Sequence, residues 1–167
     1  SCSLVGSEMC IRDSNNDDSI NKSVEIIKKE WGTIDFIIHA VAFADKSELN
    51  GRYVDTTKDN FINCLEISCF SLTSLARNFE PIMNDGGSIL TLTFYGSNKV
   101  IPNYNLMGIA KAALETSVKY LSVDLGTKNI RVNAISAGPM RTIAGAAINN
   151  ARAVSYTHLR AHETARH

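Results

Sequence analysis

Three short apolar runs alternate along the chain with stretches of helical periodicity, and this alternation restricts the folds that the chain can adopt. The runs predict strands at residues 34–40 (IDFIIHA), 88–94 (SILTLTF) and 130–136 (IRVNAIS). The helical stretches are residues 23–31, 60–83 and 104–125. The first run is rich in β-branched residues and suits a strand buried on both faces of a parallel sheet.

Strands that alternate with crossover helices pair in parallel, so the sequence predicts an α/β fold with a doubly wound, Rossmann-like parallel sheet. A fold of this class begins with a strand and a glycine-rich turn that holds a pyrophosphate. No glycine cluster stands near the start of this sequence, and we expect Gly86 and Gly87 to end the helix before the second predicted strand. We therefore expect an incomplete domain, comprising its central to C-terminal part.

The two ends of the chain differ from its middle. Residues 1–14 and 154–167 show no sustained period and resemble translated sequencing adaptors, so we expect the domain to comprise residues 15–153. His158 and His162 have the i, i+4 spacing of a zinc-binding helix, but they fall in the excluded end, and we predict no metal site.

Composition excludes several classes of partner. Seventeen basic side chains balance seventeen acidic ones, which argues against nucleic acid and anionic membrane surfaces as partners. No apolar run approaches the roughly 20 residues that span a bilayer. We expect a cytoplasmic protein with a small-molecule or protein partner.

One tyrosine and one lysine stand seven residues apart at the start of the third helical stretch. Tyr104 and Lys111 would share one helix face, roughly 10 Å apart along the axis. Two reactive groups placed in this way can face one ligand. Taken alone, the spacing also suits a tyrosine at a strand-to-helix junction and a solvated surface lysine.

The neighbouring residues carry a resemblance to a known family. IPNYNLMGIAK, with TLTFYG upstream and VNAISAGPMRT downstream, resembles the NADH-dependent bacterial enoyl-acyl carrier protein reductases, a branch of the short-chain dehydrogenases. Most short-chain dehydrogenases space tyrosine and lysine by four, the position of Gly108 here, whereas the enoyl reductase branch uses seven. The resemblance covers residues 20–148. It implies hydride transfer from NADH, with NADPH not excluded, to an enoyl thioester on acyl carrier protein, in a homotetramer.

The resemblance also implies roles for individual residues. Tyr104 would donate a hydrogen bond to the enolate oxygen formed during reduction, and Lys111 would bind the cofactor and favour the anionic phenol. The implied cofactor-binding residues are Val41, Lys111, Met140, Thr142 and Ala144, and the implied substrate-binding residues are Ala44, Phe94, Tyr95, Met107 and Ile148.

Three positions need separate comment. Many family members have glycine where this chain has Ala42, and commonly a tyrosine where it has Phe94. Tyr95 would point to the opposite face from Phe94 unless the strand has already ended. We expect His39, at the end of an apolar strand, to be a core histidine rather than a catalytic base.

Two other functions stay open. A 3-oxoacyl or alcohol reductase of the short-chain class would need a serine near Tyr104 to bind the substrate oxygen, and Ser97 is the nearest candidate. A truncated chain could instead only pack against intact subunits. We expect the chain as written to be inactive, since the first nucleotide-binding strands are absent from it.

Overall fold

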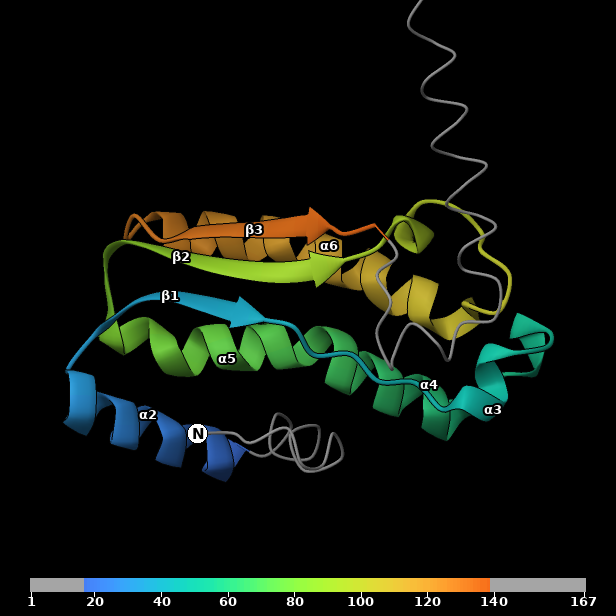
Figure 1. The fold of residues 1–167 in the computed structure, drawn as a ribbon, viewed down its shortest axis with the longest axis horizontal. Coiled ribbons are helices and arrows are strands. Elements are labelled where there is room, and N and C mark those ends of the chain that lie inside the picture. The colour runs from blue at the N-terminus through green and yellow to red at the C-terminus, as the bar shows by residue number, and fades with distance from the viewer. Residues whose placement is uncertain (1–16, 139–167) are drawn as a thin grey trace, which may run out of the picture.

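The computed structural model describes residues 17–138, and within them three parallel strands form one sheet (Figure 1). The strands are β1 (Ile34–His39), β2 (Met83–Thr93) and β3 (Arg131–Ser136), paired in the order β1-β2-β3. The predicted parallel α/β architecture is confirmed. Because the strands are parallel, their carboxyl ends meet at one edge of the sheet.

Helices connect the strands as the sequence indicated. The helices are α2 (Asp17–Trp31), α3 (Lys46–Leu49), α4 (Lys58–Leu65), α5 (Ser71–Phe79) and α6 (Asn105–Gly126), with short turns η1 (Tyr53–Asp55), η2 (Glu66–Phe70), η3 (Glu80–Ile82) and η4 (Tyr95–Ser97). Helix α2 begins six residues before the predicted start, where Asp17 and Asp18 place negative charge in its first turn. No helix within the described range is long and apolar enough to cross a bilayer.

The predicted helix of residues 60–83 is not continuous. The π-helical turn η2 separates α4 from α5, and α5 is followed by η3, in which Pro81 has no N–H to extend an α-helical ladder. The expectation that Gly86 and Gly87 end this helix is wrong. Both glycines lie in β2, where the pairing register with β1 shifts between Ile34 and Phe36.

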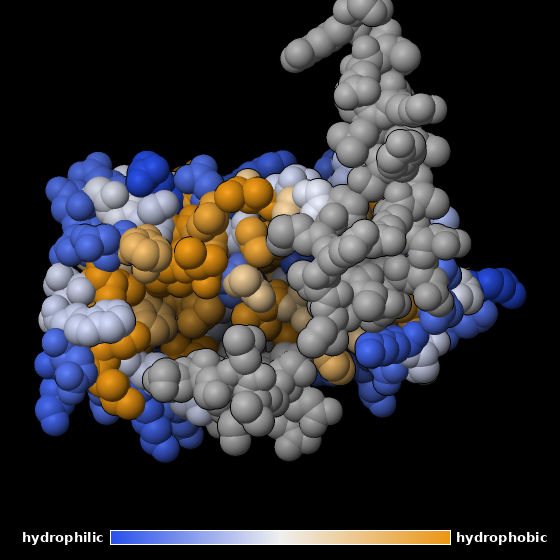
Figure 2. All heavy atoms as spheres, viewed as in Figure 1, coloured by the Kyte–Doolittle hydropathy of each residue, from blue (hydrophilic) through white to orange (hydrophobic). Residues whose placement is uncertain are grey.

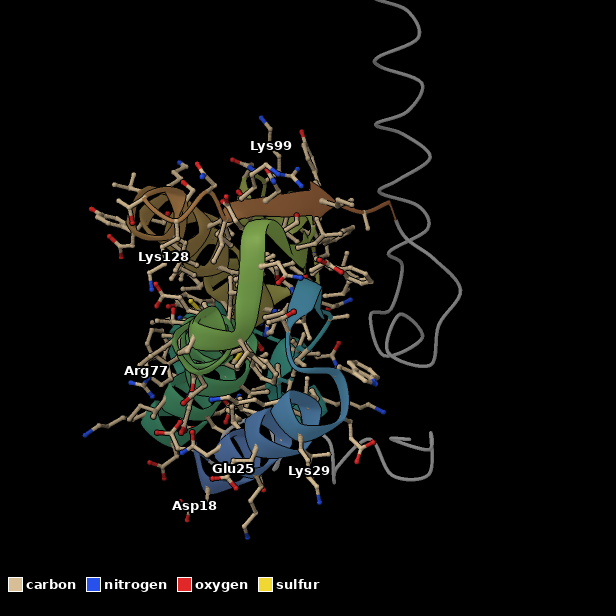
Figure 3. All side chains as sticks on the ribbon, turned by 90° about the vertical axis from the view of Figure 1, so that its left-hand side faces the viewer. Asp18, Glu25, Lys29, Arg77, Lys99 and Lys128 are labelled. Atoms are coloured by element: carbon tan, nitrogen blue, oxygen red, sulfur yellow. The ribbon has the colours of Figure 1, made fainter. Side chains whose placement is uncertain are left out.

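The described helices lie on one face of the sheet, as the turned view shows (Figure 3). Two apolar clusters fill the space between the layers. One joins α5, α6, β2 and β3, and the other packs α2 against the end of α5. Their buried members are Leu72, Ala76, Ile89, Leu114, Leu125, Ile130 and Val132 in the first, and Ile20, Phe79 and Ile82 in the second.

The opposite face of the sheet is apolar and open among the described residues (Figure 2). Phe36 is 65% exposed and Ile38 is 59% exposed, because no described helix covers this side of β1. The expectation of a strand buried on both faces is therefore wrong for β1 within residues 17–138.

A buried polar network joins β1, β2 and the start of α5. The His39 side chain is 1% exposed, with Nδ1 2.8 Å from Thr91 Oγ1 and Nε2 2.8 Å from Ser71 Oγ. Ser71 donates its own hydroxyl hydrogen to the Ile67 carbonyl, so Nε2 donates to Ser71. The Thr91 hydroxyl lies within hydrogen-bond distance of both Nδ1 and, at 3.2 Å, the His39 carbonyl, and its one hydrogen serves these two acceptors. Burial, reinforced by the charge of Lys111, lowers the pKa of His39 to about 4. His39 is a core histidine, as predicted.

The depressed pKa of His39 predicts acid sensitivity. An unfolded histidine has a pKa of 6.5, so the unfolded chain binds the extra proton first and stability falls as pH drops from 6.5 towards 4. We expect this residue to account for about 2–3 kcal/mol of that loss. Urea unfolding across this pH range, compared between the parent chain and His39→Gln, measures the difference. Identical pH dependence in both proteins would contradict the assignment.

Candidate active site

The segment IPNYN places Tyr104 at the start of α6 with its side chain inside the protein. The neighbours Asn103 and Asn105 both have positive φ, 61° and 22°, which asparagine tolerates better than most residues. The Asn105 side chain donates to the Gly51 carbonyl at 3.2 Å and so ties the turn to the segment after α3. Tyr104 forms the N-cap position of α6 and is 4% exposed.

The Tyr104 ring lies in an apolar cluster. It meets the Phe94 ring edge to face, with 5.1 Å between centroids, and shares the cluster with Cys64 and Met107. Burial raises the pKa of the phenol above its ordinary value, and no hydrogen bond to the hydroxyl is found among the described residues. Lys111 is not among the causes of this shift, so its expected effect on the phenol stays a prediction. Tyr104 is a neutral donor, and no residue from 17 to 138 accepts its hydrogen.

Lys111 lies two turns further along the same face of α6 and is 7% exposed. Its Nζ donates to the Leu92 carbonyl near the carboxyl end of β2, at 2.8 Å. Burial lowers the pKa of Lys111, and among the described residues no carboxylate pairs with it. An ammonium has three donors, and residues 17–138 take up only one of them. The other two suit a ligand with hydroxyl or other acceptor oxygens.

The segment after β1 is held at the same edge of the sheet. Ser68, in the π-helical turn η2, donates to the Phe43 carbonyl at 3.0 Å and accepts from the Phe43 N–H at 2.9 Å. Ala44, one residue on, packs against the cluster that contains Tyr104. Val41 is half-buried on this segment and Ala42 is exposed. Ser68 was missed by the sequence analysis, although a serine amid apolar helix residues was a usable signal.

The segment after β2 supplies a second wall. The strand ends at Thr93 and Tyr95 opens the 3₁₀ turn η4, so the alternation of strand side chains does not separate Phe94 from Tyr95. Both rings are half-buried and pack against the cluster of Tyr104 and Met107. Phe94 makes the edge-to-face ring contact with Tyr104.

A carboxylate on α6 fixes this segment. Thr93 and Ser97 both donate their hydroxyls to Glu115 Oε1, at 2.6 Å and 2.5 Å, and the Asn98 amide donates to Ser97 Oγ at 2.8 Å. The Ser97 hydroxyl is thus already engaged both as donor and as acceptor. Glu115 was also missed; its place one turn after Lys111 was the available signal.

The remaining predicted residues fall into two groups. Met107 is buried beside Tyr104 but does not line the cavity that borders this tyrosine, so its role in an acyl pocket stays a prediction. A cavity of about 350 Å³ borders Tyr104, and its described lining does not include Lys111. Among residues 17–138 no group of three or more metal-binding side chains is present. Met140, Thr142, Ala144 and Ile148, together with His158 and His162, lie outside the described residues.

Comparison with known proteins extends these observations. The chain is 62% identical over 138 residues to the enoyl-[acyl-carrier-protein] reductase [NADH] FabI of Rickettsia felis. This match covers 83% of the chain and 53% of that relative. It is 57% identical over 136 residues to the enoyl-[acyl-carrier-protein] reductase [NADH] 2 of Rhizobium meliloti, a match that covers 81% of this chain and 51% of that relative. The chain thus spans about half the length of the curated relatives it matches.

Solved structures that resemble this chain are also enoyl-acyl carrier protein reductases. The reductase of Anaplasma phagocytophilum in complex with NAD is 57% identical with a TM-score of 0.75, covering 77% of this chain and 49% of that one. The Bacillus cereus enoyl-acyl carrier protein reductase, with NADP+ and an indole naphthyridinone, is 48% identical with a TM-score of 0.82, covering 84% and 55%. A family model described as enoyl-(acyl carrier protein) reductase matches residues 3–166. The chain belongs to the enoyl-(acyl carrier protein) reductase family.

Proposed function

We propose that this chain is the catalytic part of an NADH-dependent enoyl-acyl carrier protein reductase, which reduces a trans-2-enoyl thioester in fatty acid elongation. The observation that supports it is a buried tyrosine and a buried lysine on one face of α6, with a phenol hydrogen and two ammonium donors that the described part of the chain does not engage. The names of the relatives support the substrate and the cofactor.

The tyrosine is suited to stabilise developing negative charge. When a hydride adds to the β-carbon of an enoyl thioester, charge moves to the thioester oxygen, and a donor placed there lowers the barrier. The raised pKa keeps Tyr104 protonated at physiological pH, so it presents a hydrogen rather than a phenolate. In apolar surroundings this hydrogen bond is stronger than in water.

The lysine is suited to hold the cofactor. A reduced nicotinamide would supply the hydride, and the two unused donors of Lys111 fit its ribose hydroxyls. Val41, Met140, Thr142 and Ala144 complete the proposed cofactor set, while Ala44, Phe94, Tyr95, Met107 and Ile148 form the proposed substrate set. NADPH remains an alternative cofactor, since the Bacillus cereus relative was solved with NADP+.

We propose the remaining properties on the same basis. The domain comprises residues 15–153, the ends are not part of it, and the chain alone does not turn over substrate. The complete enzyme is a cytoplasmic homotetramer. Exposed apolar side chains on α4, η2 and α6 support burial between subunits: Ile62, Phe70, Ile109, Tyr120 and Val123.

The function is tested in a chimera in which the aligned segment of this chain replaces its counterpart in the Rickettsia felis relative. We expect NADH oxidation with an enoyl thioester and not with a 3-oxoacyl thioester. Tyr104→Phe should lower kcat at least about 10²-fold, as loss of a transition-state donor does. Tyr120→Phe removes the hydroxyl of a second tyrosine on the same helix, which we place at a subunit contact and away from the site, and as the matched control it should leave kcat unchanged.

Lys111→Met in the same chimera should weaken NADH binding, measured by fluorescence titration, because the buried ammonium is removed. Lys119→Met, exposed on the same helix, controls for loss of charge. Tight NADH binding by the 167-residue chain alone would refute the proposal that it is inactive by itself. Turnover of the 3-oxoacyl substrate instead of the enoyl substrate would refute the reductase assignment.

A separate variant distinguishes the short-chain 3-oxoacyl reductase. That enzyme requires a serine hydroxyl on the substrate oxygen, whereas here Ser97 is bound to Glu115 and Asn98. We expect Ser97→Ala to keep kcat within about fivefold of the parent chimera, because a loop hydrogen bond contributes only about 1 kcal/mol. A loss as large as that of Tyr104→Phe would favour the rival function.

A further inference from the structure

Two glycines stand against Tyr104 for reasons of space and not of backbone conformation. Gly96 lies in η4, after β2, and Gly108 lies in the second turn of α6. Neither has the positive φ that favours glycine over other residues. Glycine also weakens a helix interior relative to alanine, so its presence at position 108 needs a packing reason.

The packing reason is that Gly96, Gly108 and the Tyr104 ring lie in close contact. A Cβ on Gly96 would lie 2.5 Å and 2.6 Å from Cδ1 and Cε1 of the Tyr104 ring. A Cβ on Gly108 would lie 2.8 Å from the carbonyl oxygen of Gly96. The Tyr104 ring therefore lies directly against the Gly96 backbone, and that backbone lies directly against α6.

The surroundings prevent an easy adjustment. Glu115 holds the segment of Gly96 through Thr93 and Ser97, on either side of the glycine. The Phe94 ring contacts the Tyr104 ring, and the tyrosine is almost fully buried. A side chain at position 96 or 108 would consequently have to move the Tyr104 ring or separate α6 from the segment after β2.

We propose that Gly96 and Gly108 are positioning residues that set the orientation of the Tyr104 phenol. The Gly96 carbonyl leaves no room for any side chain at position 108, four residues after the tyrosine. A lysine that serves the same site must therefore come from further along the helix, and Lys111 is the residue that reaches the Leu92 carbonyl. The inference rests on the proposed function only for the catalytic role of the Tyr104 hydroxyl, and the packing of the two glycines does not depend on it.

The test compares Gly96→Ala and Gly108→Ala with Gly126→Ala in the full 167-residue chain. Gly126 ends the same helix, and a Cβ there would meet no atom within 4 Å. With tyrosines carrying carbon-13 at Cζ, the resonance of Tyr104 is identified as the one lost in Tyr104→Phe. We expect both site variants to shift this resonance and to lower the melting temperature by several degrees. Gly126→Ala should leave the resonance in place and the melting temperature equal or higher.

The same substitutions in a chain that already carries Tyr104→Ala separate the contact made by Gly96 from the contact made by Gly108. Once Tyr104→Ala has removed the ring, Gly96→Ala should lose most of its effect on the melting temperature. Gly108→Ala should keep its effect, since its obstacle is the Gly96 carbonyl. In the chimera, Gly96→Ala and Gly108→Ala should lower kcat and leave KM for NADH unchanged, unlike Gly126→Ala, which should match the parent.

The proposal is overturned if Gly108→Ala behaves like Gly126→Ala and the Tyr104 resonance stays in place. It is also overturned if Gly96→Ala lowers the melting temperature by the same amount in the parent chain and in the Tyr104→Ala chain. The resonance and melting measurements use neither NADH nor an enoyl substrate. A failure of the positioning proposal is therefore distinguishable from a failure of the proposed reductase function.

Discussion

The parallel pairing of three strands is the constraint on which the rest of the structure depends. It brings the segments after β1 and β2 to one edge of the sheet, and α6 runs back from that edge. Side chains distant in sequence then meet there: Ala44 follows β1, Phe94 follows β2, and Tyr104 opens α6. The hydrogen bond from Lys111 to the Leu92 carbonyl ties the helix directly to the central strand.

Burial gives this region its chemical character. The pKa of His39 is lowered to about 4 and that of Cys64 is raised to about 11, in both cases mainly by removal from water. The pKa of Tyr104 is raised and that of Lys111 is lowered for the same reason. Every one of these shifts favours the uncharged form. A ligand that accepts hydrogen bonds from the phenol and the ammonium would meet little competition from water.

The sequence predicted the local elements better than the long-range contacts. Short apolar runs and helical periodicity located all three strands and the helix of Tyr104 and Lys111, because these features depend on nearby residues. The π-helical turn at Glu66–Phe70 and the irregular start of β2 at Met83 were not predicted, since they arise from packing between elements. Sequence periodicity also could not show that no helix within residues 17–138 covers one face of β1.

The same distinction applies to the site. The interval of seven residues predicted that Tyr104 and Lys111 share one face of a helix, and the structure shows that both are also buried there. The partners of Ser68 and Glu115 lie 25, 22 and 18 residues away in sequence, so nothing local revealed their roles. Spacing also carries no information about burial, which is the main cause of the raised pKa of Tyr104.

The most direct test of the account follows the hydride itself. The chimera would be supplied with NADH deuterated at the transferring position and with an enoyl thioester, and the product would be analysed by mass spectrometry and NMR. The account predicts a saturated thioester that carries one deuterium at the β-carbon. A parallel reaction would be supplied with a 3-oxoacyl thioester. Recovery of the enoyl thioester unreduced and unlabelled, with deuterium found instead at carbon 3 of the reduced 3-oxoacyl substrate, would contradict the proposed function.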